Sequence, residues 1–246
     1  MLLKLKQSTP TFMIFGETGQ YPITVLIKTK MLVFWYKLVS DKCNKISSHT
    51  YTLLYNMYKN GIHENKYLTC IKNILIEIGM PYLWLSQNVS HMSISCFRLK
   101  VKQALRDVFL QNWYSHIDND SIYTNYRMFK TSFVQEPYIS LLPSTCVITL
   151  IRFRTTNNPL PVNTLRYERI QRNERVCAKC NIRDIGDEYH YILVCPFFTP
   201  KRKECLSKVY QTNPNAIKYK MLLSNENKNV LLKLKHFISI IIKELQ

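Results

Sequence analysis

The sequence predicts a mostly α-helical protein that carries a small zinc knuckle near residue 190 and ends in an amphipathic helix. Two observations predict the helices: the 246 residues include only 5 glycines, and apolar residues recur at intervals of three and four. A third observation predicts the zinc knuckle, because three cysteines and one histidine follow the spacing C-x2-C-x9-H-x4-C.

The first half of the chain is expected to contain a short tail and three helices. Residues 1–20 form a tail that leads into a glycine-containing turn. Residues 23–39 are apolar on most of a helical circumference, which indicates a buried helix. A second helix ends at Gly61, and a third covers about 65–78, where a glycine and a proline follow it.

The second half is expected to contain a long helix over 95–117 and a short one over 122–133. The pairs Glu136–Pro137 and Leu142–Pro143 bracket a stretch that is expected to be irregular and to form the boundary between the helical part and the zinc part. Residues 227–246 are amphipathic and are expected to dock on the core, with pairing to another chain or a membrane surface as alternatives. The predicted divisions are a tail (1–20), a helical region (21–145), a basic segment with the zinc knuckle (146–210) and a C-terminal amphipathic helix (211–246).

The cysteine and histidine spacing predicts a structural metal site. Thiolate and imidazole are the ligands that Zn²⁺ prefers, and four of them leave no open position for a reacting water. The alternative is a set of structural cysteines without a metal. The predicted ligands are Cys177, Cys180, His190 and Cys195.

Residues between the ligands are expected to shape this site. Gly186 allows a sharp reversal, and Asp187 is a good N-cap for a short helix that carries His190. Asp187 or Glu188 is also placed to accept the second imidazole N–H of that histidine. Cys205 is a possible substitute ligand, although a buried apolar role on a following helix is favoured.

A large excess of positive charge predicts a polyanionic partner. The chain has 34 basic and 16 acidic residues, a net charge of +18, and a protein that neutralises phosphates gains free energy by releasing their counterions. A generic basic surface, or cations that only balance the thiolates, is the alternative. The nucleic-acid-binding candidates are Arg152, Arg154, Arg166, Arg172, Arg175, Lys179, Lys201, Arg202 and Lys203.

No catalytic centre is predicted. His116, Asp118 and Asp120 resemble a metal-dependent nuclease site only weakly, since no distant acidic partner accompanies them. The sequence also lacks a polymerase-type aspartate pair and a glycine-rich phosphate loop. No uncharged apolar run approaches the length that spans a bilayer, so no membrane partner is expected. Without a secretory signal the cysteines indicate a reducing, intracellular compartment.

Four stretches, 16–22, 100–113, 151–162 and 175–198, occur in an order that resembles a known family. It is the region downstream of the polymerase core in LINE-type (non-LTR) retrotransposon reverse transcriptases. The resemblance implies a thumb-like or linker-like helical part followed by the zinc knuckle, with the same four zinc ligands. It also implies a role in holding template RNA, and target DNA as well, in the nucleus and the cytoplasm.

The resemblance does not extend to the catalytic parts of that family. The palm with its catalytic aspartates and the endonuclease have no counterpart here, so the expected function is non-catalytic nucleic-acid binding. The missing polymerase domain is an expected partner. A zinc-stabilised protein-interaction scaffold and a decayed, non-functional fragment are the alternatives.

Overall fold

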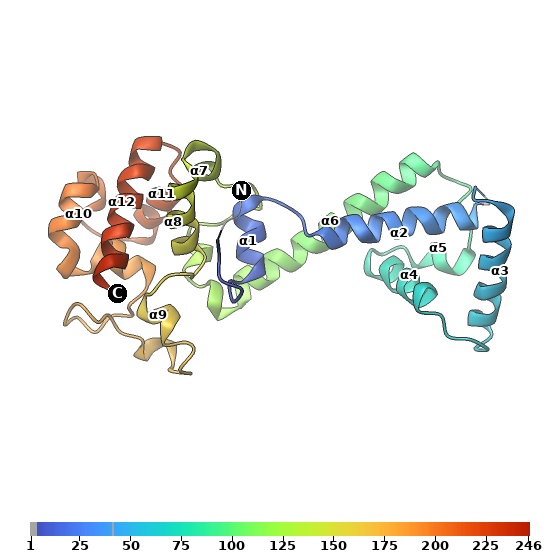
Figure 1. The fold of residues 1–246 in the computed structure, drawn as a ribbon, viewed down its shortest axis with the longest axis horizontal. Coiled ribbons are helices and arrows are strands. Elements are labelled where there is room, and N and C mark those ends of the chain that lie inside the picture. The colour runs from blue at the N-terminus through green and yellow to red at the C-terminus, as the bar shows by residue number, and fades with distance from the viewer. Residues whose placement is uncertain (1–3, 41) are drawn as a thin grey trace. The chain divides into compact units, whose positions relative to one another are not determined.

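The computed structural model describes residues 4–40 and 42–246, which form helices joined by short loops (Figure 1). Within these ranges there is no β-strand, and a single isolated bridge pairs Val176 with Ile185. The mostly α-helical class is therefore confirmed. The chain divides into two compact units: Tyr21–Trp113 is contiguous, and the other unit combines Met1–Gln20 with Tyr114–Gln246.

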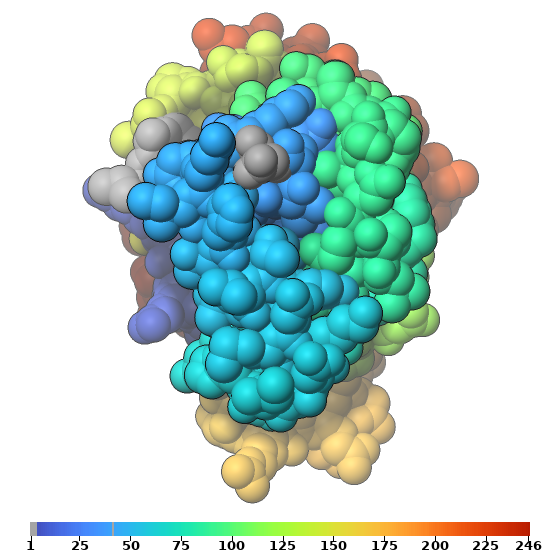
Figure 2. Space-filling view, turned by 90° about the vertical axis from the view of Figure 1, so that its right-hand side faces the viewer, coloured from blue at the N-terminus to red at the C-terminus, as the bar shows by residue number. Residues whose placement is uncertain are grey.

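The contiguous unit is built around a buried aromatic and aliphatic core. Trp35 and Phe97 are fully buried, and the Trp35 indole donates to the Tyr51 hydroxyl at 2.8 Å. The Asn65 side chain caps its helix by accepting two backbone N–H groups. Figure 2 views this unit from the end at which α3 (Lys45–Lys59) lies. Its helices are α2 (Ile23–Val39), α3 (Lys45–Lys59), α4 (Lys66–Glu77), α5 (Pro81–Ser86) and the first part of α6 (Ile94–Asn119).

The discontinuous unit packs its C-terminal helix against the centre of its core. α12 buries Leu234, Phe237 and Ile241 and contacts α8 and α10, which lie beside it in Figure 1. Docking of the amphipathic C-terminal helix is therefore confirmed. The other α-helices of this unit are α1 (Thr11–Thr18), α7 (Pro137–Leu141), α8 (Ser144–Arg154), α9 (Pro161–Thr164), α10 (Thr199–Cys205) and α11 (Ala216–Leu223); α12 spans Lys228–Glu244.

Three expectations about these elements are wrong. Residues 122–133 form no α-helix but short 3₁₀ turns, because the buried rings of Tyr123 and Phe129 anchor the backbone in an irregular path. The connection over 136–143 is mostly helical rather than irregular, since Pro137 begins α7 and Pro143 precedes the first residue of α8, where a missing N–H costs nothing. The division between the units also falls inside α6, not near residue 145.

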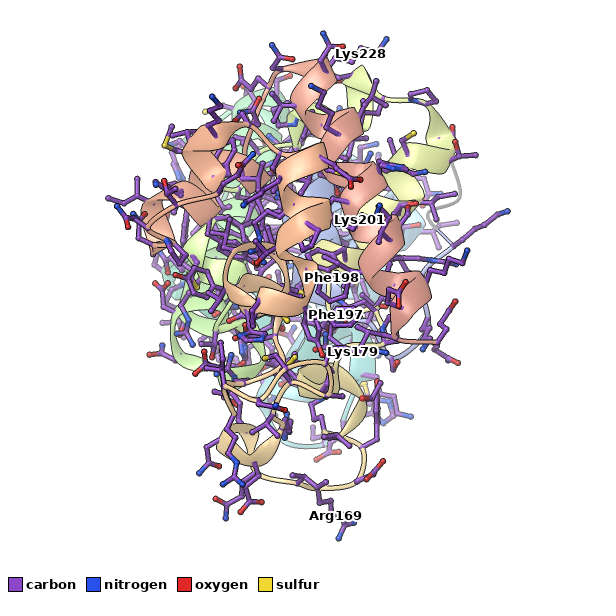
Figure 3. The ribbon with its side chains drawn as sticks, turned by 90° about the vertical axis from the view of Figure 1, so that its left-hand side faces the viewer. Arg169, Lys179, Phe197, Phe198, Lys201 and Lys228 are labelled. Atoms are coloured by element: carbon purple, nitrogen blue, oxygen red, sulfur yellow. The ribbon has the colours of Figure 1, made fainter. Side chains whose placement is uncertain are left out.

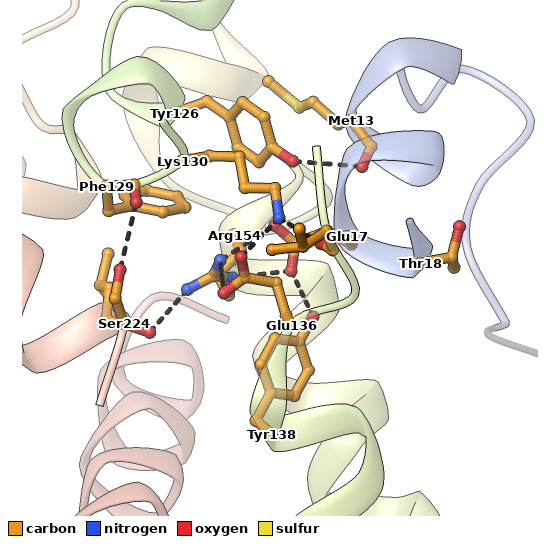
Figure 4. A network of polar contacts seen from close by, with 12 residues as sticks. Met13, Glu17, Thr18, Tyr126, Phe129, Lys130, Glu136, Tyr138, Arg154 and Ser224 are labelled. Carbon is orange, nitrogen blue, oxygen red and sulfur yellow. Dashed lines mark hydrogen bonds and ion pairs between the residues drawn. The ribbon is translucent and has the colours of Figure 1, made fainter. Parts of the chain in front are cut away.

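Residues 11–18, expected to be part of a tail and turn, instead form α1, which belongs to the discontinuous unit and supplies a buried carboxylate. Arg154 holds Glu17 through two hydrogen bonds of 2.8 and 3.0 Å and binds Glu136 at 2.6 Å (Figure 4). Lys130 pairs with the other oxygen of Glu136, and the Tyr138 hydroxyl donates to Glu17. All five side chains are buried, and such charges are tolerated only when each has a partner.

Gly19 ends α1 in a left-handed conformation and lies against the backbone of the same unit. Its φ is +63°, and a Cβ would lie 2.5 Å from the amide nitrogen of Gln135. We expect Gly19→Ala to lower the free energy of unfolding by about 1–2 kcal/mol for the left-handed backbone, plus about 1–3 kcal/mol for the steric overlap.

Gly61 provides the matched control for this measurement by urea unfolding. Its φ is +70°, but nothing lies within 4 Å of the added Cβ, so Gly61→Ala carries the backbone cost alone. For each variant, the free energy of unfolding is taken from the transition of the unit that carries the substitution. If both variants lost the same free energy of unfolding, the close approach at Gly19 would be contradicted.

Candidate metal centre

The first two cysteines lie in a tight hairpin. The N–H of Cys177 donates to the carbonyl of Asp184 at 2.9 Å, which brings the two arms of the hairpin together. Inside the turn, the N–H of Lys179 points at the sulfur of Cys177 at 3.4 Å. This geometry directs the sulfurs of Cys177 and Cys180 to the same side, as the two-residue spacing predicts.

Gly186 follows the hairpin for a reason other than the expected one. A Cβ there would lie 2.9 Å from Cγ of Pro161 and 3.1 Å from Cα of Cys177. The glycine is therefore required by close packing between the hairpin and the start of α9, and not by a left-handed turn.

The other two ligands come from a short π-helix, His190–Val194, and from the residue after it, Cys195. As predicted, Asp187 caps this segment, because its carboxylate accepts the N–H of His190 at 2.9 Å. Pro196 then starts a new turn, which leaves Cys195 at the end of the π-helix. A π-helical turn is wider than an α-helical one and often marks a functional position.

The four side chains converge on one point. Their ligand atoms all lie within 4.8 Å of one another, and three of the four residues are buried. The sulfurs of Cys177 and Cys195 are 3.9 Å apart, and Nε2 of His190 is 3.4 Å from the sulfur of Cys180. A tetrahedral zinc site with usual bond lengths has edges of about 3.8 Å between sulfurs and about 3.6 Å between sulfur and nitrogen. The cluster can therefore hold a metal ion.

Burial and the cluster's own neighbouring groups shift the pKa values of its members. Burial works to raise the pKa of Cys177, but the Tyr191 hydroxyl and a backbone N–H lower it below its usual value. Burial and the neighbouring Cys177 raise the pKa of Cys195 to about 12. Burial lowers the pKa of His190, which keeps the imidazole neutral. A divalent ion would relieve the repulsion between thiolates and take the imidazole in its ligand form.

No protein-family model, curated protein or solved structure matches this chain.

The second imidazole nitrogen of His190 faces a different carboxylate from the expected ones. Nδ1 lies 3.6 Å from the carboxylate of Asp184, within ion-pair range but too long for a hydrogen bond. Asp187 serves as the cap instead, and Glu188 is buried elsewhere, where three asparagine amides donate to it. The hairpin therefore supplies Cys177 and Cys180 and also Asp184, the carboxylate that Nδ1 of His190 faces. Cys205 is buried on α10, outside the cluster, as favoured from the sequence.

Two of the arginines that the sequence marks for nucleic acid are buried, which corrects their assignment to the surface. Arg154 belongs to the ion-pair network with Glu17. Arg202 donates to the carbonyl oxygens of Ile192 and Cys195 at 2.6 and 2.9 Å. It thereby satisfies carbonyls of the π-helix and fixes the backbone of a ligand. The sequence contains one signal for this buried role of Arg202, because it lies three positions before Cys205 and so on the same face of the helix.

Two further arginines mainly support the loops around the cluster. Arg175 directs three hydrogen bonds at the carbonyls of Val162 and Ile170, and burial lowers its pKa. Arg172 pairs with the capping Asp187 at 3.2 Å and is partly exposed. Because their hydrogen bonds go to the protein, these side chains are less able to bind a ligand than free cations.

The remaining candidates are accessible to solvent. The guanidinium of Arg152 rests on the carbonyl of Lys4, and Lys201 pairs with Glu204 on the surface of α10. Lys179 lies over the ring of Phe197 at 5.8 Å, and Figure 3 shows this pair below Lys201 on one side of the unit. The partly or fully exposed cations of the predicted set are Arg152, Arg166, Arg172, Arg175, Lys179, Lys201 and Lys203.

The weak nuclease candidate does not form a metal-ligand group. His116 pairs with Asp120 at 2.8 Å on the exposed end of α6. Among residues 4–40 and 42–246, the cysteine–histidine cluster is the only group of three or more metal-binding side chains that converge. In the same ranges, no helix has both the length and the apolar character needed to cross a bilayer.

Proposed function

We propose that the cluster holds a structural Zn²⁺ and that this zinc knuckle presents a surface for single-stranded nucleic acid. Three thiolates and one imidazole at tetrahedral spacing support zinc over harder cations such as Mg²⁺, which prefer oxygen. With four protein ligands no position remains for an activated water, so the proposed role is non-catalytic.

The observation that carries the nucleic-acid proposal is an exposed aromatic ring beside a lysine at the cluster. Phe197 is 48% exposed although it adjoins the ligand Cys195, and Lys179 lies over its ring. Single-stranded nucleic acid is bound by such pairs, because bases stack on the ring and phosphates meet the cation. The arrangement also agrees with the resemblance to the post-polymerase region of LINE-type reverse transcriptases, in which RNA and target DNA are the expected ligands.

We expect the double substitution Lys179→Glu with Phe197→Ala to weaken RNA binding at least about tenfold. Stacking of one base contributes about 1–3 kcal/mol, and the lost cation should also lower the salt dependence by about one phosphate contact. The measurement is fluorescence anisotropy with a labelled 12-nucleotide oligouridine at two or more salt concentrations.

The matched control is Lys220→Glu with Ile217→Ala, which combines the same charge reversal with the removal of an exposed apolar side chain on α11 in the same unit. It should reduce affinity only slightly, and zinc content should stay at one ion per chain in both proteins. Wild-type protein that fails to bind the oligonucleotide, or binds it without a salt dependence, would disprove the proposal.

A further inference from the structure

A groove of about 540 Å³ runs between α2 and α6 within the contiguous unit. Its floor consists of residues that also belong to the core of this unit, among them Val25, Thr29 and Val33, which are buried. The groove lies entirely among residues 21–106 and shares no residue with the metal cluster. It is therefore a second candidate site.

One wall of the groove is an exposed apolar stripe on α2. Ile23, Leu26 and Phe34 line it and are 65%, 47% and 49% exposed. With Lys30 and Lys37 they occupy positions spaced by three and four residues, so all five face the groove from one side of the helix. The stripe runs from Ile23 to Lys37, fifteen residues that rise about 21 Å along the helix.

The opposite wall is a stripe of cations on α6. Arg98, Lys102 and Arg106 are spaced four residues apart and all line the groove. α2 has no acidic residue, and α6 has none before Asp107. By contrast, Lys28 on another face of α2 is paired with Glu77 at 2.6 Å.

These cations lack acidic partners in the part of the chain that the structure describes. No ion pair there involves any of the five cations that line the groove, which are Lys30, Lys37, Arg98, Lys102 and Arg106. The guanidinium of Arg106 lies over the ring of Tyr21 at 4.9 Å, and its buried Nε atom makes no hydrogen bond. The groove thus combines an apolar floor and wall with positive charge that nothing in this unit neutralises.

We propose that this groove binds an acidic amphipathic helix of a partner protein. Apolar side chains of that helix would cover Ile23, Leu26 and Phe34. Its carboxylates, repeated every four residues, would meet Arg98, Lys102 and Arg106. A groove about 20 Å long between two helices accommodates about four helical turns.

The lining favours a helix over the other occupants of a basic surface. Single-stranded nucleic acid is bound by successive exposed aromatic rings, whereas this lining has two, Tyr21 and Phe34, among aliphatic side chains, and Arg106 lies over the ring of Tyr21. A bilayer meets a flat or convex face, and this site is hollow. A second copy of this chain carries the same excess of positive charge, +18, and would be repelled.

The test uses a fluorescein-labelled helical peptide of about 18 residues with leucines at i, i+3, i+7 and i+11 and glutamates on both flanks. It should bind the full chain saturably and at least about tenfold more tightly than the same peptide with lysines in place of the glutamates. The double substitution Arg98→Glu with Lys102→Glu should remove most of this preference, because it lowers the charge of the lining from +5 to +1, and Leu26→Glu should reduce binding of the glutamate peptide at least about tenfold.

Leu99→Glu is the matched control, since Leu99 is exposed on α6 next to Arg98 but does not line the groove. Its affinity for the peptide should equal that of the wild type, and circular dichroism should show all variants to be equally helical. The proposal would be overturned if the peptide did not bind saturably, or if Leu26→Glu and Leu99→Glu bound it equally well. It would also be overturned if Arg98→Glu with Lys102→Glu abolished binding to phosphatidylglycerol vesicles or to oligouridine but left binding to the peptide unchanged.

Discussion

Replacing Cys195 by serine is expected to lower zinc affinity by more than about a hundredfold and to unfold the segment around the cluster. Structural zinc sites bind with about 10–16 kcal/mol that is shared by four ligands, so the loss of one thiolate removes several kcal/mol. Cys195 is fully buried at the end of the π-helix, and its carbonyl accepts a hydrogen bond from Arg202. Native mass spectrometry measures the zinc, and thermal melting followed by circular dichroism measures the folding.

Cys205→Ser is the control for this variant, because Cys205 is also a buried free thiol but lies outside the cluster. It should keep one zinc per chain and lose only a little stability. Chelation of the wild type should reproduce the Cys195→Ser melt. If the two serine variants retained equal amounts of zinc, the cluster would not be a metal site.

Replacing Arg154 by methionine is expected to lower the free energy of unfolding by about 3–5 kcal/mol, the second large effect. The substitution keeps much of the side-chain volume but leaves the carboxylates of Glu17 and Glu136 without their shared partner. The carbonyl of Leu223 also loses a donor at 2.6 Å. Urea unfolding of the discontinuous unit measures the change.

Arg152→Met tests whether the loss of stability in Arg154→Met is caused by the burial of Arg154. Arg152 lies on the same helix but is exposed, and its hydrogen bonds go only to the carbonyl of Lys4. We expect a loss of less than about 1 kcal/mol. Adding Glu17→Gln to Arg154→Met should recover part of the stability, since one of the unpaired charges is removed. Equal losses for the two arginine variants would refute the account of the network.

The sequence could predict that Cys177, Cys180, His190 and Cys195 converge, because their geometry is set locally. Cys177 and Cys180 share one turn, and Asp187 caps the segment that carries His190, so short-range rules are sufficient. The long helices were predictable for the same reason, as for Ile23–Val39, where apolar periodicity decides the outcome. The metal itself and the nucleic-acid partner remain predictions.

The roles of the buried arginines could not be predicted from the sequence, since they depend on contacts between distant residues. Glu17 and Arg154 are 137 positions apart, and no local pattern says that they meet. An arginine next to aromatic and polar residues is normally expected at the surface, whereas Arg154 and Arg202 are buried and donate to buried acceptors. The division inside α6 could not be predicted either, because a continuous helix contains no sequence signal of a boundary between units.

The insertion of one unit into the other sets an order of events on the ribosome. Residues 21–113 are contiguous, so they can fold as soon as they leave the exit tunnel. α1 is made before this unit, but Glu17 finds its partner only when Arg154 emerges, 137 positions further along the chain. During synthesis the amino-terminal segment is therefore exposed to chaperones and proteases, and the inserted unit completes its core first.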